Sequence, residues 1–250
     1  MNRRRPVLFA ALTALFAVAY ISAIVKGPQL YTDYMSWKVG SRVVMITFPG
    51  GGGGTGFHVQ AKSGETFLIT NSHICDRSTD GQLNVQHPDN NQRAIPRRIL
   101  ENSATTDLCL VEPLPGIVGL RLGSSLTVGQ LVQSYGHPGL RPLTQAKGSV
   151  VSREKIEILY DWINSDADRA ACSKPKNKIE MVQTIFGIGE ACLLVIDAVD
   201  TTVRTFPGSS GSPLVNEAGN VVGVIFASSN STNNGCAVPL DALKQFLSQY

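Results

Sequence analysis

The sequence predicts an all-β domain, either a barrel or a sandwich, with a helix at its carboxyl end. Short apolar or alternating stretches recur along the chain, and clusters of Gly, Pro, Asn and Asp separate them. Helical periodicity is scarce before the C-terminal residues. The stretches that predict strands are Val43–Phe48, Phe67–Thr70, Asp107–Val111, Gln130–Tyr135, Leu193–Ala198, Ser212–Val215 and Val221–Ala227.

The predicted C-terminal helix covers about residues 239–249. Pro239 suits a first helical position, and Asp241 falls in the first turn. Four apolar residues share one face of this helix and predict that it packs on the domain: Leu240, Leu243, Phe246 and Leu247.

The N-terminus predicts a transmembrane helix. Residues 6–25 are an uncharged, mostly apolar run of 20 residues that follows Arg3, Arg4 and Arg5. As a helix this run spans roughly 30 Å, the hydrocarbon thickness of a bilayer. The arginines should remain cytoplasmic, so the chain after Lys26 is expected outside the cytoplasm, in the periplasm or cell envelope.

A cleaved signal peptide is the alternative, because Ala17–Ala19 resembles a cleavage site. Cleavage would make the protein secreted. The predicted organisation is therefore an anchor or signal sequence over 1–26, a linker over 27–37 and one domain over 38–250.

Charge argues against a nucleic-acid partner. The formal net charge is +3, which Arg3, Arg4 and Arg5 supply in full, so the rest of the chain is neutral overall. A neutral domain has no general attraction for phosphates. The glycine run 50–54 is not a phosphate loop either, because Phe57 and His58 stand where Lys and Ser or Thr would be needed. It predicts a flexible hairpin.

Three segments carry candidate catalytic residues. Ser210 lies in the glycine-rich turn Pro207–Leu214, His73 ends an apolar strand, and Asp107 begins another. A serine hydroxyl needs a base and an orienting carboxylate to attack at neutral pH. The chain order His, Asp, Ser is that of chymotrypsin-type enzymes and differs from the subtilisin and α/β-hydrolase orders.

These segments resemble the trypsin-like serine proteases, in particular the HtrA-like (Deg) branch, over about residues 38–250. Further motifs in the expected order are Gly54–Val59, Leu120–Ser125, Val128–Pro138, Lys147–Ser152 and Gly219–Val224. The resemblance implies a two-barrel chymotrypsin-like fold, with barrel 1 at about 38–118 and barrel 2 at about 119–238. No PDZ domain is expected, since the chain ends at Tyr250 after the predicted helix.

The resemblance also implies a serine endopeptidase that forms an acyl-enzyme. His73 would be the general base, Asp107 would orient it, and Ser210 would attack. The backbone N–H groups of Gly208 and Ser210 would form the oxyanion hole. Ser209 replaces the usual Asp or Asn and Ser212 the usual Gly. The alternative function is a binding or scaffold module of the same fold with weak or no catalysis, if Ser209 prevents the hole from forming.

Substrate specificity should depend on residues around the turn. The resemblance implies one wall of Arg204, Thr205 and Phe206 and another of Phe226, Ala227 and Ser228. None of these is acidic, so a preference for Lys or Arg is not expected. An inward Arg204 would favour acidic side chains. An outward Arg204, the favoured alternative, leaves small or medium apolar ones.

Five cysteines leave at least one unpaired. Cys172 and Cys192 are the predicted disulfide, whereas Cys75, Cys109 and Cys236 are expected to be buried free thiols. The insertion 153–181 departs most from the family and is predicted to be partly helical over Glu154–Trp162. It either regulates access to the cleft or is a solvated surface insertion.

No cofactor or metal is predicted. His58, His87 and His137 are expected to be structural or at the surface, because no pair of them has zinc-site spacing with the cysteines. The predicted partners are a protein or peptide substrate and a membrane contacted through residues 6–25. The oligomeric state stays open.

Overall fold

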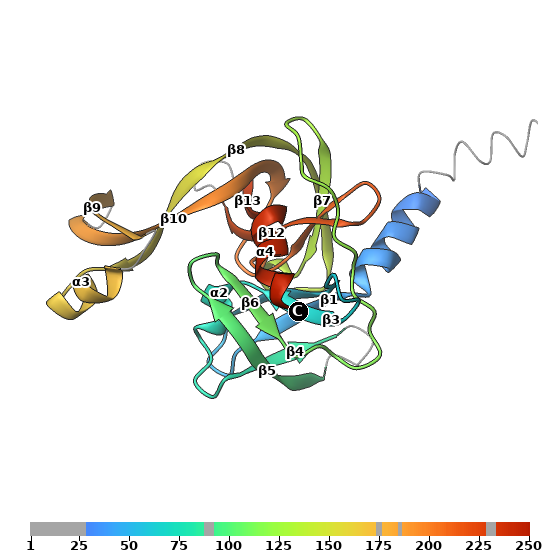
Figure 1. The fold of residues 1–250 in the computed structure, drawn as a ribbon, viewed down its shortest axis with the longest axis horizontal. Coiled ribbons are helices and arrows are strands. Elements are labelled where there is room, and N and C mark those ends of the chain that lie inside the picture. The colour runs from blue at the N-terminus through green and yellow to red at the C-terminus, as the bar shows by residue number, and fades with distance from the viewer. Residues whose placement is uncertain (1–28, 88–92, 174–176, 185–186, 229–233) are drawn as a thin grey trace, which may run out of the picture.

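The computed structural model describes residues 29–87, 93–173, 177–184, 187–228 and 234–250. They form two β-barrels and a long arm that extends from one of them (Figure 1). The predicted transmembrane helix over 6–25 lies outside these ranges. Within them, no helix has the length and apolar character needed to cross a membrane.

Barrel 1 is a closed six-stranded barrel with the strand order β1-β2-β3-β6-β5-β4. All of its pairings are antiparallel, and the pair Met45–Gln86 closes the barrel between β1 and β4. A four-residue helix, α2 (Ser72–Cys75), follows β3. The strands are β1 (Val43–Thr47), β2 (Gly53–Gln60), β3 (Thr66–Thr70), β4 (Gln82–Gln86), β5 (Ala94–Ser103) and β6 (Leu108–Val111).

Barrel 2 contains the remaining motifs. Its sheet has the order β13-β12-β11-β7-β8-β10-β9, and pairing of β10 with β13 closes six of these strands into a second barrel. The strands are β7 (Leu131–Gly136), β8 (Thr144–Trp162), β9 (Asn177–Thr184), β10 (Gly187–Arg204), β11 (Pro213–Asn216), β12 (Val221–Ser228) and β13 (Asn234–Pro239). The predicted all-β, two-barrel architecture is therefore confirmed.

An apolar core joins the two barrels to the C-terminal helix. Phe57 and Leu110 of barrel 1 belong to the same buried cluster as Tyr135 and Val224 of barrel 2. The predicted helix is α4 (Leu240–Phe246), continued by a 3-10 turn over Leu247–Gln249, and its four predicted apolar residues are buried. Pro239 precedes the helix as its N-cap.

Part of the expected linker is helical. Residues 29–40 form a helix, called here the N-terminal helix, which leads into β1. Met35 and Val39 on its inner face are buried against barrel residues. The helix therefore belongs to the folded unit and lies at one end of the molecule (Figure 1).

The insertion forms the arm, defined here as residues 154–198. The expected helix over Glu154–Trp162 is wrong, because β8 continues through this segment and pairs with β10 up to Trp162–Ala191. The alternation of charged and apolar residues from Lys155 suits such a ribbon better than a helix. The helix of the arm, α3 (Asp166–Cys172), comes later and begins after Ser165, whose hydroxyl accepts from the Asp168 N–H.

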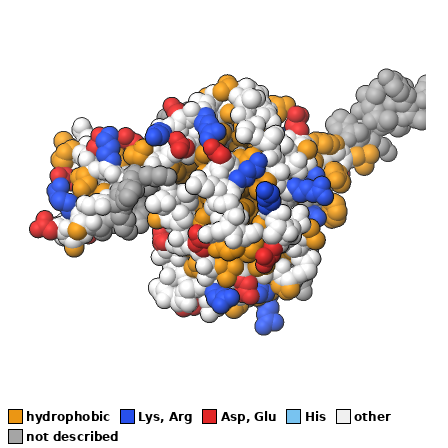
Figure 2. All heavy atoms as spheres, in the orientation of Figure 1, with side chains coloured by type: hydrophobic (Ala, Val, Ile, Leu, Met, Phe, Trp, Pro, Cys, Tyr) orange, Lys and Arg blue, Asp and Glu red, His pale blue; other side chains and the backbone are white. Residues whose placement is uncertain are grey.

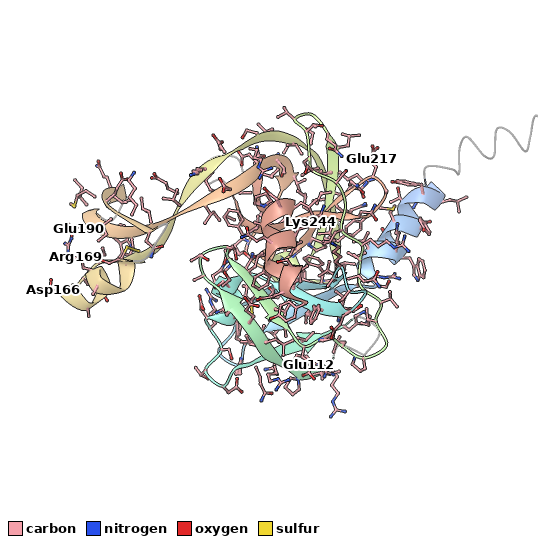
Figure 3. The ribbon with its side chains drawn as sticks, in the orientation of Figure 1. Glu112, Asp166, Arg169, Glu190, Glu217 and Lys244 are labelled. Carbon is pink, nitrogen blue, oxygen red and sulfur yellow. A yellow bond between two sulfur atoms is a disulfide. The ribbon has the colours of Figure 1, made fainter. Side chains whose placement is uncertain are left out.

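The outer end of the arm is held by covalent and ionic links. A disulfide joins Cys172 of α3 to Cys192 of β10. Arg169 forms an ion pair with Glu190, and both lie at the end of the arm in Figure 3. Lys178 pairs with Glu157 at 3.0 Å. These links connect α3, β8, β9 and β10 at the outer end of the arm.

Candidate active site

Two neighbouring strands of barrel 1 bring His73 and Asp107 together. Thr70 of β3 pairs with Cys109 of β6, so the residues after β3 and before β6 meet at one edge of the barrel. His73 Nδ1 lies 3.0 Å from both carboxylate oxygens of Asp107. The backbone N–H of His73 donates to Oδ1 at 3.1 Å. The carboxylate therefore holds the ring and its backbone in one orientation.

The Asp107 carboxylate is buried and its backbone is unusual. Its φ is +51°, in the left-handed region that Asp tolerates better than most residues. The Asn71 side-chain amide donates to the Asp107 carbonyl at 2.9 Å and supports this conformation. With Nδ1–H directed at the carboxylate, Nε2 is the ring nitrogen that can accept a proton.

A disulfide between Cys75 and Cys109 lies directly behind this pair. The expectation of free thiols is wrong for both cysteines. They lie in different elements, α2 and β6, and the turn of α2 brings Cys75 to a Cα–Cα distance of 6.5 Å from Cys109. Cys236 is the free, buried cysteine among the described residues. Burial and the adjacent Asp200 carboxylate raise the pKa of its thiol to about 12.

The Ser210 turn is attached to both barrels. The Thr55 N–H of β2 donates to the Ser210 carbonyl at 2.8 Å, and the Gly211 N–H donates to the Ile225 carbonyl at 2.7 Å. Gly211 has φ +85°, and a Cβ there would lie 1.9 Å from the Thr55 carbonyl oxygen. This close approach requires glycine. The Ser210 hydroxyl donates to the Phe226 carbonyl at 3.2 Å.

The preceding backbone presents two free donors. Among the described residues, neither the Gly208 N–H nor the Ser210 N–H has a hydrogen-bond acceptor. The neighbouring carbonyls point elsewhere: that of Pro207 accepts from Gly139 at 2.6 Å, and that of Gly208 accepts from the Thr55 hydroxyl at 2.8 Å. Two adjacent free N–H groups can bind an oxyanion.

Ser209 stabilises the same turn. Its hydroxyl accepts from the Phe206 N–H at 3.2 Å, and its own N–H donates to the Phe206 carbonyl at 2.9 Å. The side chain is buried. Serine at this position therefore leaves the backbone N–H groups of Gly208 and Ser210 free to bind an oxyanion. Ser212 is fully buried, and its hydroxyl has no hydrogen-bond partner among the described residues.

The support from residues 137–140 was not foreseen from the sequence. The His137 N–H donates to the Thr55 hydroxyl at 3.0 Å, and a Cβ on Gly208, whose φ is +94°, would lie 2.6 Å from the His137 carbonyl oxygen. Burial lowers the pKa of the His137 ring. The motif containing Gly136–Pro138 marked this segment only as the opening of barrel 2. Its contact with Gly208 depends on the meeting of segments far apart in the sequence.

A cleft of about 120 Å³ lies beside Ser210. Of the predicted wall residues, Thr205, Phe206 and Ala227 line it, whereas Arg204 and Phe226 do not. The side chain of Ser228 lies outside the described part of the structure. Arg204 is exposed and Phe226 is in the core. None of the described residues that line the cleft is charged; they are Thr205, Phe206, Pro207, Ser209, Ser210, Ile225 and Ala227. The Thr205 hydroxyl is buried in this wall without a hydrogen-bond partner among described residues.

The other histidines are buried structural groups. His58 Nδ1 donates to the Arg42 carbonyl at 3.1 Å, and its Nε2 accepts from the Leu114 N–H at 3.1 Å. Burial lowers the pKa of His58 to about 4. His87 Nε2 lies 3.0 Å from the Ser41 carbonyl. In the part of the chain described, no group of three or more His, Cys, Asp or Glu side chains could hold a metal ion.

Acidic and basic side chains are interspersed over the face of the molecule seen in Figure 2. This agrees with the overall charge balance of the chain after its N-terminal arginines.

Solved structures with the same fold include several bacterial proteases. The active form of the protease Rv3671c from M. tuberculosis is 16% identical with a TM-score of 0.65, covering 88% of this chain and 86% of that one. A serine endoprotease from Yersinia pestis is 15% identical with a TM-score of 0.61, covering 87% and 65%. The HtrA-type protease AlgW is 22% identical with a TM-score of 0.60, covering 88% and 62%.

At these identities the likeness establishes the fold. The family follows from the sequence itself, because residues 54–224 match the family model described as a trypsin-like peptidase domain. The matched range contains His73, Asp107 and Ser210. The chain therefore belongs to the trypsin-like peptidase family and is a serine endopeptidase.

Proposed function

We propose that this endopeptidase uses Ser210 as nucleophile, His73 as general base and Asp107 to orient the base, and that it works outside the cytoplasm while tethered to a membrane. The observation that carries the catalytic part is that the backbone N–H groups of Gly208 and Ser210 have no hydrogen-bond acceptor among the described residues. They occur together with a histidine ring held by a buried carboxylate.

The reaction begins with a change of the Ser210 rotamer. The hydroxyl leaves the Phe226 carbonyl and turns to His73 Nε2, which takes its proton as Oγ attacks the peptide carbonyl. The carbonyl oxygen becomes negatively charged and accepts from the Gly208 and Ser210 N–H groups. His73 then gives its proton to the leaving amine, which leaves an acyl group on Ser210. Water activated by His73 hydrolyses this ester.

The side chain before the scissile bond enters the cleft of about 120 Å³ beside Ser210. The uncharged lining and the exposed position of Arg204 favour small or medium apolar residues. A charged side chain would lose its hydration without gaining a partner of opposite charge.

A fluorophosphonate probe tests the catalytic assignment. The wild-type protein and Ser212→Ala should be labelled, whereas Ser210→Ala should not. Ser212 is a matched control because it lies in the same turn but is fully buried. A binding module without turnover predicts no labelling of the wild-type protein. Labelling that survives in Ser210→Ala contradicts the assignment of the nucleophile.

Membrane tethering rests on the uncharged apolar run 6–25 after three arginines. It predicts that the full-length chain stays in the membrane fraction at alkaline pH and that the domain is digested by protease added from the extracytoplasmic side. Recovery of a soluble chain that begins after Ala19 would instead identify a cleaved signal peptide. Digestion only from the cytoplasmic side would contradict the proposed orientation.

A further inference from the structure

The N-terminal helix carries an exposed apolar stripe. Leu30, Tyr34 and Trp37 follow the spacing i, i+4, i+7 and lie on one face of the helix. Their exposed fractions are 65%, 53% and 63%. The opposite face is different, since Met35 and Val39 are buried in the core. The helix is thus apolar on both sides, but among the described residues only one side packs against the rest of the chain.

The helix is fixed to the domain, so the stripe cannot turn inward. The Tyr31 hydroxyl donates to the carbonyl of Glu217, a residue that Figure 3 labels close to this helix. Lys38 Nζ donates to the Ala218 carbonyl at 2.5 Å, and the Arg42 guanidinium donates to the Lys38 carbonyl at 2.8 Å. Apolar side chains gather over this end of the molecule in Figure 2.

The composition of the stripe fits a lipid headgroup layer. Trp and Tyr are enriched there because their rings are apolar and their N–H and O–H groups stay hydrated. The Arg42 guanidinium lies 5.4 Å from the Trp37 ring centre and can meet lipid phosphates beside it. Arg42 also donates to the carbonyl of Val118, which is 63% exposed and extends the apolar surface. Asp33, at the edge of the stripe, accepts from Gln29 at 2.8 Å.

The chain before the helix identifies the partner. Only Lys26, Gly27 and Pro28 separate the apolar run 6–25 from the helix. Four residue steps span at most about 14 Å. If the run crosses a bilayer, as proposed above, the helix begins within that distance of the hydrocarbon edge, and the headgroup layer fills about 5–8 Å of it. The start of the stripe therefore lies within about 10 Å of the headgroup layer and can reach it.

We infer that Leu30, Tyr34 and Trp37 form a membrane seat, an interfacial contact that holds the protease domain against the lipid surface in one orientation. This inference rests on the proposed tethering. The arm lies at the other end of the long axis of the molecule (Figure 1), so the seat directs the arm away from the bilayer.

The two tryptophans of the chain provide a matched test. Trp37 lies in the seat, and Trp162 lies in the arm. The full-length chain is reconstituted into vesicles of phosphatidylcholine and phosphatidylglycerol in equal parts, with and without bromine on the acyl carbons nearest the headgroup. Trp162→Phe then reports on Trp37 alone, and Trp37→Phe reports on Trp162 alone. Fluorophosphonate labelling verifies that each variant is folded.

The membrane seat predicts that Trp37 emission shifts to shorter wavelength and is mostly lost with brominated lipid, while Trp162 emission is unchanged. Leu30→Ser with Tyr34→Ser should restore much of the Trp37 emission. If the chain floats with the vesicles but Trp37 is not quenched, the seat is wrong although the tether holds. If the chain does not float and Trp37 is not quenched, both fail. A third outcome is a dimer in which Trp37 is protected from an aqueous quencher but is not quenched by brominated lipid. That result would show that the stripe binds a second copy of the chain and would contradict the membrane seat.

Discussion

Cys75 and Cys109 are joined by a disulfide, and each lies two residues beyond a member of the His73–Asp107 pair. The crosslink therefore connects the two segments that must stay in register for the imidazole to face the carboxylate. In barrel 1 this link complements the pairing of β3 with β6.

Replacing both Cys75 and Cys109 with Ala should destabilise the protein and lower turnover. The sequence separation of 34 residues corresponds to about 4 kcal/mol of unfolding free energy by loop-closure entropy. Chemical denaturation and kcat on a short ester substrate measure the two effects. Cys172→Ala with Cys192→Ala is the control, because that disulfide lies in the arm and should leave kcat on a short ester unchanged. Equal loss of kcat in both double variants would argue against a specific role of the first crosslink.

Gly208→Ala should lower kcat by about a hundredfold to a thousandfold with little change in KM. The added Cβ would lie 2.6 Å from the His137 carbonyl oxygen at a backbone φ of +94°, so the Gly208 N–H must move. Gly129→Ala has a comparable φ of +83° but no atom within 4 Å of the added Cβ. It should cost stability without changing kcat. Wild-type kcat in Gly208→Ala would show that this N–H is not an oxyanion donor.

Stability should fall as the pH is lowered from about 6.5 towards 4. Burial lowers the pKa of His58 to about 4, below the unfolded value of 6.5, so the folded state favours the neutral ring. Below pH 6.5 the ring protonates in the unfolded chain but stays neutral in the folded one, which favours unfolding. The free energy of unfolding should therefore fall by about 2 kcal/mol between pH 7 and pH 5. Urea denaturation at both pH values measures the loss. His58→Gln should be less stable at pH 7 and show a smaller pH dependence. An unchanged pH dependence in this variant would assign it to other groups.

Thr205→Val should favour larger apolar residues before the scissile bond. The Thr205 hydroxyl is buried in the cleft wall without a partner among the described residues, and a methyl group of similar size removes that polar atom. The ratio of kcat/KM for leucine and alanine peptide substrates should rise severalfold. Arg204→Ala is the control and should leave this ratio unchanged. We expect the wild-type protein to cleave poorly after aspartate, and Arg204→Ala should leave that unchanged too. A marked effect of Arg204→Ala on aspartate substrates would mean that the guanidinium reaches the cleft.

Several local features could be predicted from the sequence because they depend on neighbouring residues. The alternation of apolar residues located most strands, and Leu240, Leu243, Phe246 and Leu247 predicted the buried face of the terminal helix. The arm shows the limit of such patterns. A helix is predicted over Glu154–Trp162, whereas pairing of this segment with β10 stabilises a ribbon.

The sequence by itself determined the family, the two-barrel fold and the order of the candidate catalytic residues, because short motifs in a fixed order carry that information. Only the tertiary structure decided that Cys75 meets Cys109, that Gly139 supports the Pro207 carbonyl, and that Arg204 is exposed and does not line the cleft. These relationships arise between segments that are distant in sequence. Their geometry is set by the closure and packing of the barrels, which no local pattern of residues encodes.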